Sequence, residues 1–130
     1  MKLVVDSDFL IALYKPLDSN HQKAINIYKK IQNEYTLTAL NIVFQESTTV
    51  ISKQIGMDNA RNFHQLITKL IHEQVILTNE LEKDTWKLFL KQTKKGTSFI
   101  DCANLAFCQK YKLDGILSFD DFYPKEVVFN

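Results

Sequence analysis

Glycine and proline are scarce in this sequence of 130 residues, which contains only three Gly and two Pro. Hydrophobic residues make up 45% of the chain. This composition argues against a disordered chain and indicates an ordered globular protein that can bury a real core. No internal repeat, low-complexity tract or linker interrupts the sequence, so we expect residues 1–130 to form a single domain.

Neither sign of charge dominates, because 16 Lys and Arg stand against 15 Asp and Glu, for a net charge of +1. Such a balance neither supports nor excludes a nucleic-acid partner. Cysteine is also rare. Cys102 and Cys108 lack the C-x-x-C spacing, so we expect buried free thiols and a reducing compartment. His21, His64 and His72 are scattered, and no combination of His and Cys has the spacing of a zinc site.

Long hydrophobic runs are absent. No apolar run approaches the length of about 20 residues that spans a bilayer, so we expect no membrane association. The N-terminus enters the segment MKLVVD directly, without the apolar region of a signal peptide. We therefore expect a cytoplasmic protein.

Short apolar segments alternate with longer segments of helical periodicity. Strands are predicted at 2–5, 35–38, 75–77 and 116–117, with a last edge strand at 126–129. Helices are predicted at 8–14, from Asn20, at 41–54, from Asp58, from Thr78 or Asn79, and from Ser98, with Asn20, Asn41 and Ser98 as N-caps and Gly56 as a stop. This alternation predicts an α/β fold, a three-layer sandwich in which helices flank a mainly parallel sheet of four to five strands.

The stretch from 97 to 123 reads as a helix followed by a short buried strand. Its helix from Asp101 to Tyr111 rises about 15 Å, at roughly 1.5 Å per residue. The return from Gly115 to Asp120 covers about 16 Å at roughly 3.3 Å per residue, so the two lengths match. We therefore expect the side chains of Asp101 and Asp120 to meet at one end of the fold.

Two further acids are expected at the same rim. Asp6 ends the first strand, and Glu46 lies in the second turn of the helix that follows the second strand. Function collects at the carboxyl ends of parallel strands. Carboxylates brought together repel one another unless they are protonated or share a cation. The cluster suits one or two Mg²⁺ or Mn²⁺ ions, which prefer oxygen ligands and can activate a water molecule.

Each acid also has an ordinary structural explanation. Asp6 could simply cap the following helix, and Glu46 could be a solvated helix residue. Asp101 could be a first-turn acid favoured by the helix dipole. Asp120 or Asp121 could start a turn.

Four more residues are candidates for a supporting role around these acids. Ser7 lies at the rim beside the first acid, and Ser118 and Asp121 lie beside the last. Asn104 follows Asp101 by one helical turn and could support it, although an amide on the helix surface is the default interpretation.

Three segments carry a resemblance to a known family. VVDSDFLIALY, NIVFQESTTVI and SFIDCANLAFCQKYKLDGILSFDDFY, together with SNHQKA at 19–24, resemble segments of PIN domains, most closely the small toxin ribonucleases of the VapC type. The similarity covers essentially the whole chain and keeps the order of elements. Each motif is weak alone, whereas four in order make a specific signal.

The resemblance assigns the catalytic and metal-binding acids to Asp6, Glu46, Asp101 and Asp120. It places the family's hydroxyl residue at Ser118, where Thr is more usual. The aromatic residue that follows the last acid could be Phe122 or Tyr123. This leaves either Asp120 or Asp121 as the fourth ligand, and Asp120 is favoured.

The resemblance implies a metal-dependent endoribonuclease that cleaves structured RNA, such as tRNA or rRNA, by means of a metal-activated water. The products would carry a 5′-phosphate and a 3′-hydroxyl. It further implies a homodimer that is silenced by a cognate antitoxin, whose C-terminal segment places an Arg among the carboxylates.

Other functions remain open. A haloacid-dehalogenase-like phosphatase would use Asp6 as nucleophile and Asp8 as acid, but it leaves Glu46 and Asp101 unexplained. A non-catalytic PIN-like binding module usually lacks one or more of the four acids, all of which are present here. An RNA-processing nuclease without an antitoxin is a narrower alternative that the sequence does not separate from a toxin.

Overall fold

A sheet of four strands forms the centre of the fold in the computed structural model, which describes residues 1–129. The strands are β1 (Lys2–Val5), β2 (Thr36–Leu40), β3 (Glu73–Val75) and β4 (Gly115–Leu117). They are ordered β3-β2-β1-β4, and every neighbouring pair is parallel. The predicted α/β fold with a parallel sheet is confirmed.

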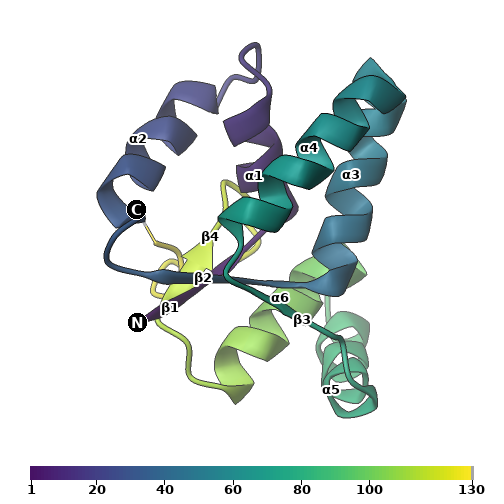
Figure 1. The fold of residues 1–130 in the computed structure, drawn as a ribbon. Helices are drawn as coiled ribbons and strands as arrows, with labels where there is room; N and C mark the ends of the chain where they lie inside the picture. The colour runs from purple at the N-terminus through teal and green to yellow at the C-terminus, as the bar shows by residue number, and fades with distance from the viewer. Residues whose placement is uncertain (130) are drawn as a thin grey trace.

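Helices cover both faces of this sheet. They are α1 (Ser7–Tyr14), α2 (His21–Ile31), α3 (Asn41–Ile55), α4 (Met57–Leu70), α5 (Asn79–Leu90) and α6 (Phe99–Lys110). Figure 1 shows α1 to α4 on one side of the sheet and α5 and α6 on the other, which gives three layers. The carboxyl ends of the central strands lie next to the start of α1 and of α6, and this is where the predicted acids gather.

The two central strands are buried on both faces. Leu3, Val4 and Val5 of β1 and Ile116 and Leu117 of β4 have no exposed surface. Their continuous apolar sequence suits a parallel strand sandwiched between helix layers. The acids that follow these strands are therefore carried on the most rigid part of the fold.

The third strand lies two residues earlier than predicted. β3 spans Glu73–Val75, whereas the apolar pattern favoured 75–77. Ile76 is 68% exposed, and the N–H of Leu77 donates to the side chain of Asn41 at 2.9 Å instead of to a strand. Asn41 is accordingly the first residue inside α3 and not its N-cap.

The predicted edge strand at 126–129 is wrong. In place of a strand, a single parallel β-bridge joins Val128 to Ile116. The residues just before Val128 form a turn, which a hydrogen bond from the Val127 N–H to the Pro124 carbonyl closes. The segment still lies close against β4. A Cβ added to Gly115 would be 3.1 Å from the carbonyl oxygen of Val127, so glycine permits this approach.

Most predicted helix boundaries are found. Ser98 caps α6 by accepting from the Asp101 N–H at 3.0 Å, and Thr78 caps α5. Gly56 separates α3 from α4 with φ +92°, a left-handed conformation that favours glycine. Asn20 stands at the cap position of α2, but its side chain makes no capping hydrogen bond.

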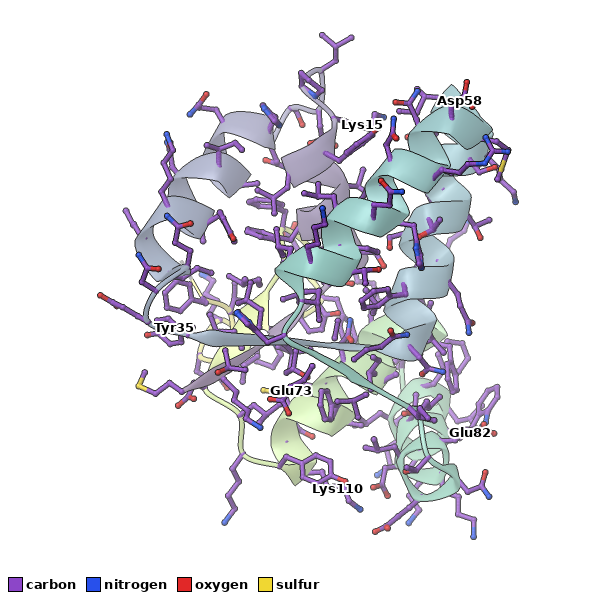
Figure 2. All side chains as sticks on the ribbon, viewed as in Figure 1. Lys15, Tyr35, Asp58, Glu73, Glu82 and Lys110 are labelled. Carbon is purple, nitrogen blue, oxygen red and sulfur yellow. The ribbon has the colours of Figure 1, made fainter. Side chains whose placement is uncertain are left out.

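Charged side chains occupy the outside of the fold. Figure 2 shows Lys15 and Asp58 at the outer ends of α1 and α4, and Glu82 and Lys110 on α5 and α6 at the opposite side. Lys110 pairs with Glu80 across these two helices, and such surface pairs add little to stability.

Inside α6, both thiols, Cys102 and Cys108, are free and buried, as predicted. Over residues 1–129 we find no helix with the length and apolar character that a bilayer crossing requires.

Candidate active site

The site begins where β1 and β4 end side by side. The Asp6 N–H donates to the carbonyl of Leu117 at 3.0 Å, so the residue after each strand lies next to the other strand. Ser118, the next residue of the chain, donates from Oγ to Asp6 Oδ2 at 2.9 Å. Strand pairing alone therefore brings together two predicted site residues that are 112 positions apart.

Asp6 is the buried centre of the cluster, with only 4% of its surface exposed. Its Oδ1 accepts from the backbone N–H of Ser7 at 2.7 Å and from Asn104 Nδ2 at 3.2 Å. Its Oδ2 accepts from Ser118 at 2.9 Å and from the Tyr123 hydroxyl at 3.1 Å. A carboxylate offers about four lone-pair positions, so these donors use all of them. Asp6 thus caps α1 and also anchors the site.

Asp101 lies in the first turn of α6 and faces Asp6 across the hydroxyl of Tyr123. Its Oδ1 is 3.4 Å from that hydroxyl. Burial, followed by the negative charges of Asp6 and Asp120, raises the pKa of Asp101 to about 6. Asp101 therefore lies close enough to Asp6 and Asp120 for both charges to act on it.

Glu46 joins the cluster from α3. The hydroxyl of Ser7 donates to Glu46 Oε2 at 3.0 Å, which orients the carboxylate toward the start of α1. Burial is the main cause that raises the pKa of Glu46. The hydrogen bond from Ser7 opposes this shift, and the charge of Asp101 adds to it. Ser7, a candidate supporting residue, thus has a defined partner.

Asp120 is the more exposed member of the cluster. Its carboxylate accepts from the Phe122 N–H at 2.9 Å, and its own N–H donates to Ser118 Oγ at 3.0 Å. The charge of Asp120 contributes to the raised pKa of Asp101 and, more weakly, to that of Asp8. Asp121 is exposed and is not among the causes of either shift. These observations favour Asp120 over Asp121 as the fourth acid.

Asp8 lies inside the cluster, although the PIN-like pattern gave it no role. Its Oδ2 accepts from the backbone N–H of Phe119 at 3.0 Å and lies 3.2 Å from Ser118 Oγ. Burial, followed by the charge of Asp6, raises the pKa of Asp8 to about 7. Asp8 therefore ties α1 to the turn after β4. Its only signal in the sequence is its position two residues after a strand-end Asp.

Asn104 is not the helix-surface amide that the sequence favoured. It is fully buried, and its Nδ2 donates to both Asp6 and the Tyr123 hydroxyl at 3.2 Å. Within residues 1–129 its Oδ1 has no hydrogen-bond partner. Apolar residues surround it on α6, and this pattern could have indicated a buried amide.

Comparison with known proteins places this chain. The PIN domain family matches residues 3–125. The chain belongs to the PIN domain family. PIN domains are generally metal-dependent, and the VapC-type proteins among them are typically nucleases. No curated protein sequence matches the chain.

Two solved structures share the fold. VapC20 of Mycobacterium tuberculosis, described as a toxin that cleaves the sarcin–ricin loop, has a TM-score of 0.82 and 21% identity over 92% of this chain and 91% of its own. VapBC2 of Rickettsia felis, bound to a DNA fragment from its promoter, has a TM-score of 0.70 and 11% identity over 92% of this chain and 88% of its own. At such identities the likeness establishes the fold alone.

The donor set of this PIN domain suits a hard divalent cation. The cluster offers carboxylate oxygens, and the pKa values of Asp6, Glu46 and Asp101 are all raised, so a cation would relieve their unfavourable ionisation. Across residues 1–129, however, no three His, Cys, Asp or Glu side chains are already arranged around one metal position.

A small adjustment would make Asp6 available to an ion. Ser118 has one hydroxyl proton and two carboxylates in reach, Asp6 at 2.9 Å through Oδ2 and Asp8 at 3.2 Å through Oδ2. If this hydroxyl donates to Asp8 instead, a lone pair of Asp6 becomes free. The freed lone pair would let Asp6 contribute to a cation held among these carboxylates.

A groove of about 490 Å³ leads away from the cluster between α3 and the start of α6. Glu46 lies on its wall together with the cation Lys53 and the aromatic ring of Phe99. A second hollow of about 510 Å³ includes Ser118, Asp120 and Lys125. The acids of this PIN domain therefore lie between two open depressions of the surface.

Proposed function

We propose that this PIN domain is an endoribonuclease that uses Mg²⁺ or Mn²⁺. One observation carries the proposal: acids from four separate segments interact electrostatically near the ends of β1 and β4, and the pKa values of three of them are raised. Over residues 1–129, no Lys, Arg or His side chain forms an ion pair with these acids. A cluster without its own counter-charge suits one or two cations.

Asp6, Glu46, Asp101 and Asp120 are the residues that would hold the ions. A bound ion would lower the pKa of a water molecule and stabilise the phosphate charge that develops during cleavage. Asp6 is held rigidly by its hydrogen bonds to Asn104 and to the N–H of Ser7. Asp120 is the exposed acid of the four, so it would be the first to meet an approaching phosphate.

The supporting residues fix the directions of these carboxylates. The hydroxyl of Ser7 orients Glu46. The hydroxyl of Ser118 accepts the Asp120 N–H and, without an ion, donates to Asp6, so it links the strand-end acid to the acid of the turn. We propose that cleavage leaves a 5′-phosphate and a 3′-hydroxyl.

Structured RNA, tRNA or rRNA, is the proposed substrate. The shared fold with VapC20, a toxin described as cleaving the sarcin–ricin loop, supports this class of substrate. The exposed Lys53 in the groove beside Glu46 could pair with a phosphate of the RNA backbone.

We further propose that the protein is the toxin of a VapBC-type pair and binds a cognate antitoxin. The shared fold with VapBC2 of Rickettsia felis supports this proposal. An Arg of the antitoxin would neutralise the acidic cluster through its planar fork of donors. A cytoplasmic location remains a prediction from the sequence.

A homodimer is the second proposed assembly. Trp86 is 44% exposed and Leu90 is 75% exposed on α5, next to the ring of Phe99 on α6. Apolar side chains grouped in this way are typical of protein contact surfaces. Analytical ultracentrifugation of the wild type beside Leu90→Glu tests this, since a dimer through α5 should dissociate in the variant.

The structure does not favour the phosphatase alternative. That enzyme would need Asp8 as an acid directed at the substrate, whereas its carboxylate accepts from the Phe119 N–H and lies against Ser118. The non-catalytic alternative expects a degenerate cluster. This chain contains all four acids, Asp6, Glu46, Asp101 and Asp120.

Cleavage of total RNA tests the proposal. Wild-type protein, purified free of any antitoxin, is incubated with Mn²⁺ or Mg²⁺ beside Asp6→Asn and Asp101→Asn, with EDTA as a control. Asp58→Asn is the matched variant, because this Asp pairs with Arg61 on the exposed start of α4. Discrete fragments are expected from the wild type and Asp58→Asn only. Absence of cleavage by folded wild type would refute the proposal.

A further inference from the structure

The hydroxyl of Tyr123 lies between two acids that come from distant parts of the chain. It is 3.1 Å from Asp6 Oδ2 and 3.4 Å from Asp101 Oδ1. Tyr123 belongs to the irregular segment after β4, and only 4% of its surface is exposed. It therefore reaches the cluster from a part of the chain that is neither helix nor strand.

The hydrogen-bond inventory fixes what this hydroxyl does. A phenol has one proton to donate, and its oxygen can also accept. Asn104 Nδ2 donates to the oxygen at 3.2 Å, so the phenol proton is left to face Asp6 and Asp101. Ionised carboxylates can only accept. The phenol proton thus offsets their mutual repulsion at the point where they approach.

Simple packing does not explain a tyrosine here. A buried hydroxyl costs free energy unless it is hydrogen-bonded, and phenylalanine would fill the same space without that requirement. Burial, followed by the charge of Asp6, raises the pKa of Tyr123, so its proton remains in place at neutral pH.

We propose that Tyr123 is a positioning residue that orients Asp6 and Asp101 toward each other for a shared divalent cation. The inference rests on the proposed metal-dependent function. Ligating carboxylates are themselves usually hydrogen-bonded by neighbouring groups, and loss of such a neighbour typically lowers metal affinity by roughly 10–100-fold. If Ser118 turned to Asp8, it would free a lone pair of Asp6 for an ion while the Tyr123 hydroxyl kept its hydrogen bond to Asp6.

The experiment is a calorimetric titration of Mn²⁺ into Tyr123→Phe in the absence of RNA. The variant removes one oxygen atom and keeps the ring. Affinity is expected to fall by about 10-fold or more. The matched control is Tyr14→Phe, which also removes a phenol oxygen, one that donates to Asn59 at 2.7 Å on the α4 side of the fold. Its Mn²⁺ affinity should stay within about two-fold of the wild type, well below that loss.

Cleavage assays supply a readout that a purely structural role would not change. In Tyr123→Phe the Mn²⁺ concentration for half-maximal cleavage should rise by the same factor as the dissociation constant, and the rate should recover at saturating Mn²⁺. Asn104→Ala provides a second variant. It removes the amide N–H that donates to the phenol oxygen of Tyr123 and thereby directs the phenol proton toward the acids. Its Mn²⁺ affinity should also fall.

Unchanged or tighter binding of Mn²⁺ by folded Tyr123→Phe would overturn the inference. So would unchanged binding by Asn104→Ala if Tyr123→Phe does not fold, or no Mn²⁺ binding by the wild type. If the wild type binds Mn²⁺ and cleaves no RNA, the nuclease proposal fails by itself. The affinity of Tyr123→Phe then still decides the inference.

Discussion

Ser7 Oγ and Glu46 Oε2 are 3.0 Å apart, although the two residues are separated by 39 positions. This bond joins the first turn of α1 to the second turn of α3, so it links the rim of β1 to the helix after β2. Ser7 also gives its backbone N–H to Asp6. One residue therefore orients two of the proposed ligands.

Ser7→Ala should weaken the site with little effect on the fold. Loss of the hydroxyl leaves Glu46 free to rotate and removes the contact that lowers its pKa. We expect the Mn²⁺ affinity to fall by about 10-fold. The free energy of unfolding should fall by about 1 kcal/mol. Calorimetry and chemical denaturation measure the two quantities.

Ser47→Ala is the matched control for that variant. Ser47 lies on α3 next to Glu46, is fully buried and donates to the Val43 carbonyl at 2.6 Å. It should lose a similar stability of about 1 kcal/mol and keep its Mn²⁺ affinity. Equal losses of affinity in both variants would mean that the effect comes from α3 as a whole.

Asp8→Asn should remain an active nuclease. An amide oxygen can still accept from the Phe119 N–H, so the turn that carries Asp120 keeps its anchor. Asp8→Leu removes this acceptor and should lower RNA cleavage by about 10-fold or more through misplacement of Asp120. Gel-based cleavage assays of the two variants measure the difference.

The same pair of assays tests the phosphatase alternative. A phosphatase with Asp8 as its acid would lose activity in Asp8→Asn and keep it in Asp101→Asn. Hydrolysis of a phosphomonoester, measured beside RNA cleavage, would reveal that pattern.

The acids at the strand ends could be predicted, because they follow from local rules. Asp6 directly follows a continuous apolar strand, and the matched lengths of helix and strand bring Asp101 toward Asp120. These relationships depend only on the rise per residue of regular structure. Their roles as metal ligands remain a prediction.

The residues around the acids could not be predicted in the same way. Tyr123 reaches Asp6 through an irregular segment, where neither helical nor strand periodicity applies. The burial of Asn104 depends on which face of α6 meets the sheet. The apolar pattern places the third strand at 75–77, whereas β3 ends at Val75. The Leu77 N–H donates to the side chain of Asn41, and no local feature of the sequence indicates this tertiary contact.

The metal-free protein should lose stability as pH rises through the weakly acidic range. The pKa of Asp8 is raised from 3.8 to about 7 in the folded state, so the folded state binds more protons than the unfolded state between these values. The free energy of unfolding contributed by Asp8 is therefore largest below about pH 4 and declines up to about pH 7.

Asp8→Asn isolates this contribution. In EDTA, the melting temperature of the wild type relative to Asp8→Asn should decrease steadily from pH 4 to pH 7 as the wild type gains a buried charge. Differential scanning calorimetry at several pH values measures this difference. A wild type that gains stability over the variant in this window would contradict the raised pKa.

Asp101→Asn should separate the repulsion between the clustered carboxylates, which destabilises the metal-free fold, from the stabilisation that a bound metal ion would supply. Without metal, the variant should melt at a temperature equal to or above that of the wild type, because one of the repelling carboxylates near Asp6 is gone. With Mn²⁺, the order should reverse. At a Mn²⁺ concentration of about 100 times the dissociation constant, binding stabilises the folded wild type by about 2.7 kcal/mol. The variant should gain less, because it lacks one of the proposed metal ligands.

Thermal scans with EDTA and with a series of Mn²⁺ concentrations measure both effects in one protein pair. Asp58→Asn, altered on exposed α4, should follow the wild type in both conditions. A clear drop in melting temperature for metal-free Asp101→Asn would show that Asp101 is held by stabilising contacts and does not repel its neighbours. A parallel Mn²⁺ response in Asp101→Asn and the wild type would place the ion away from α6.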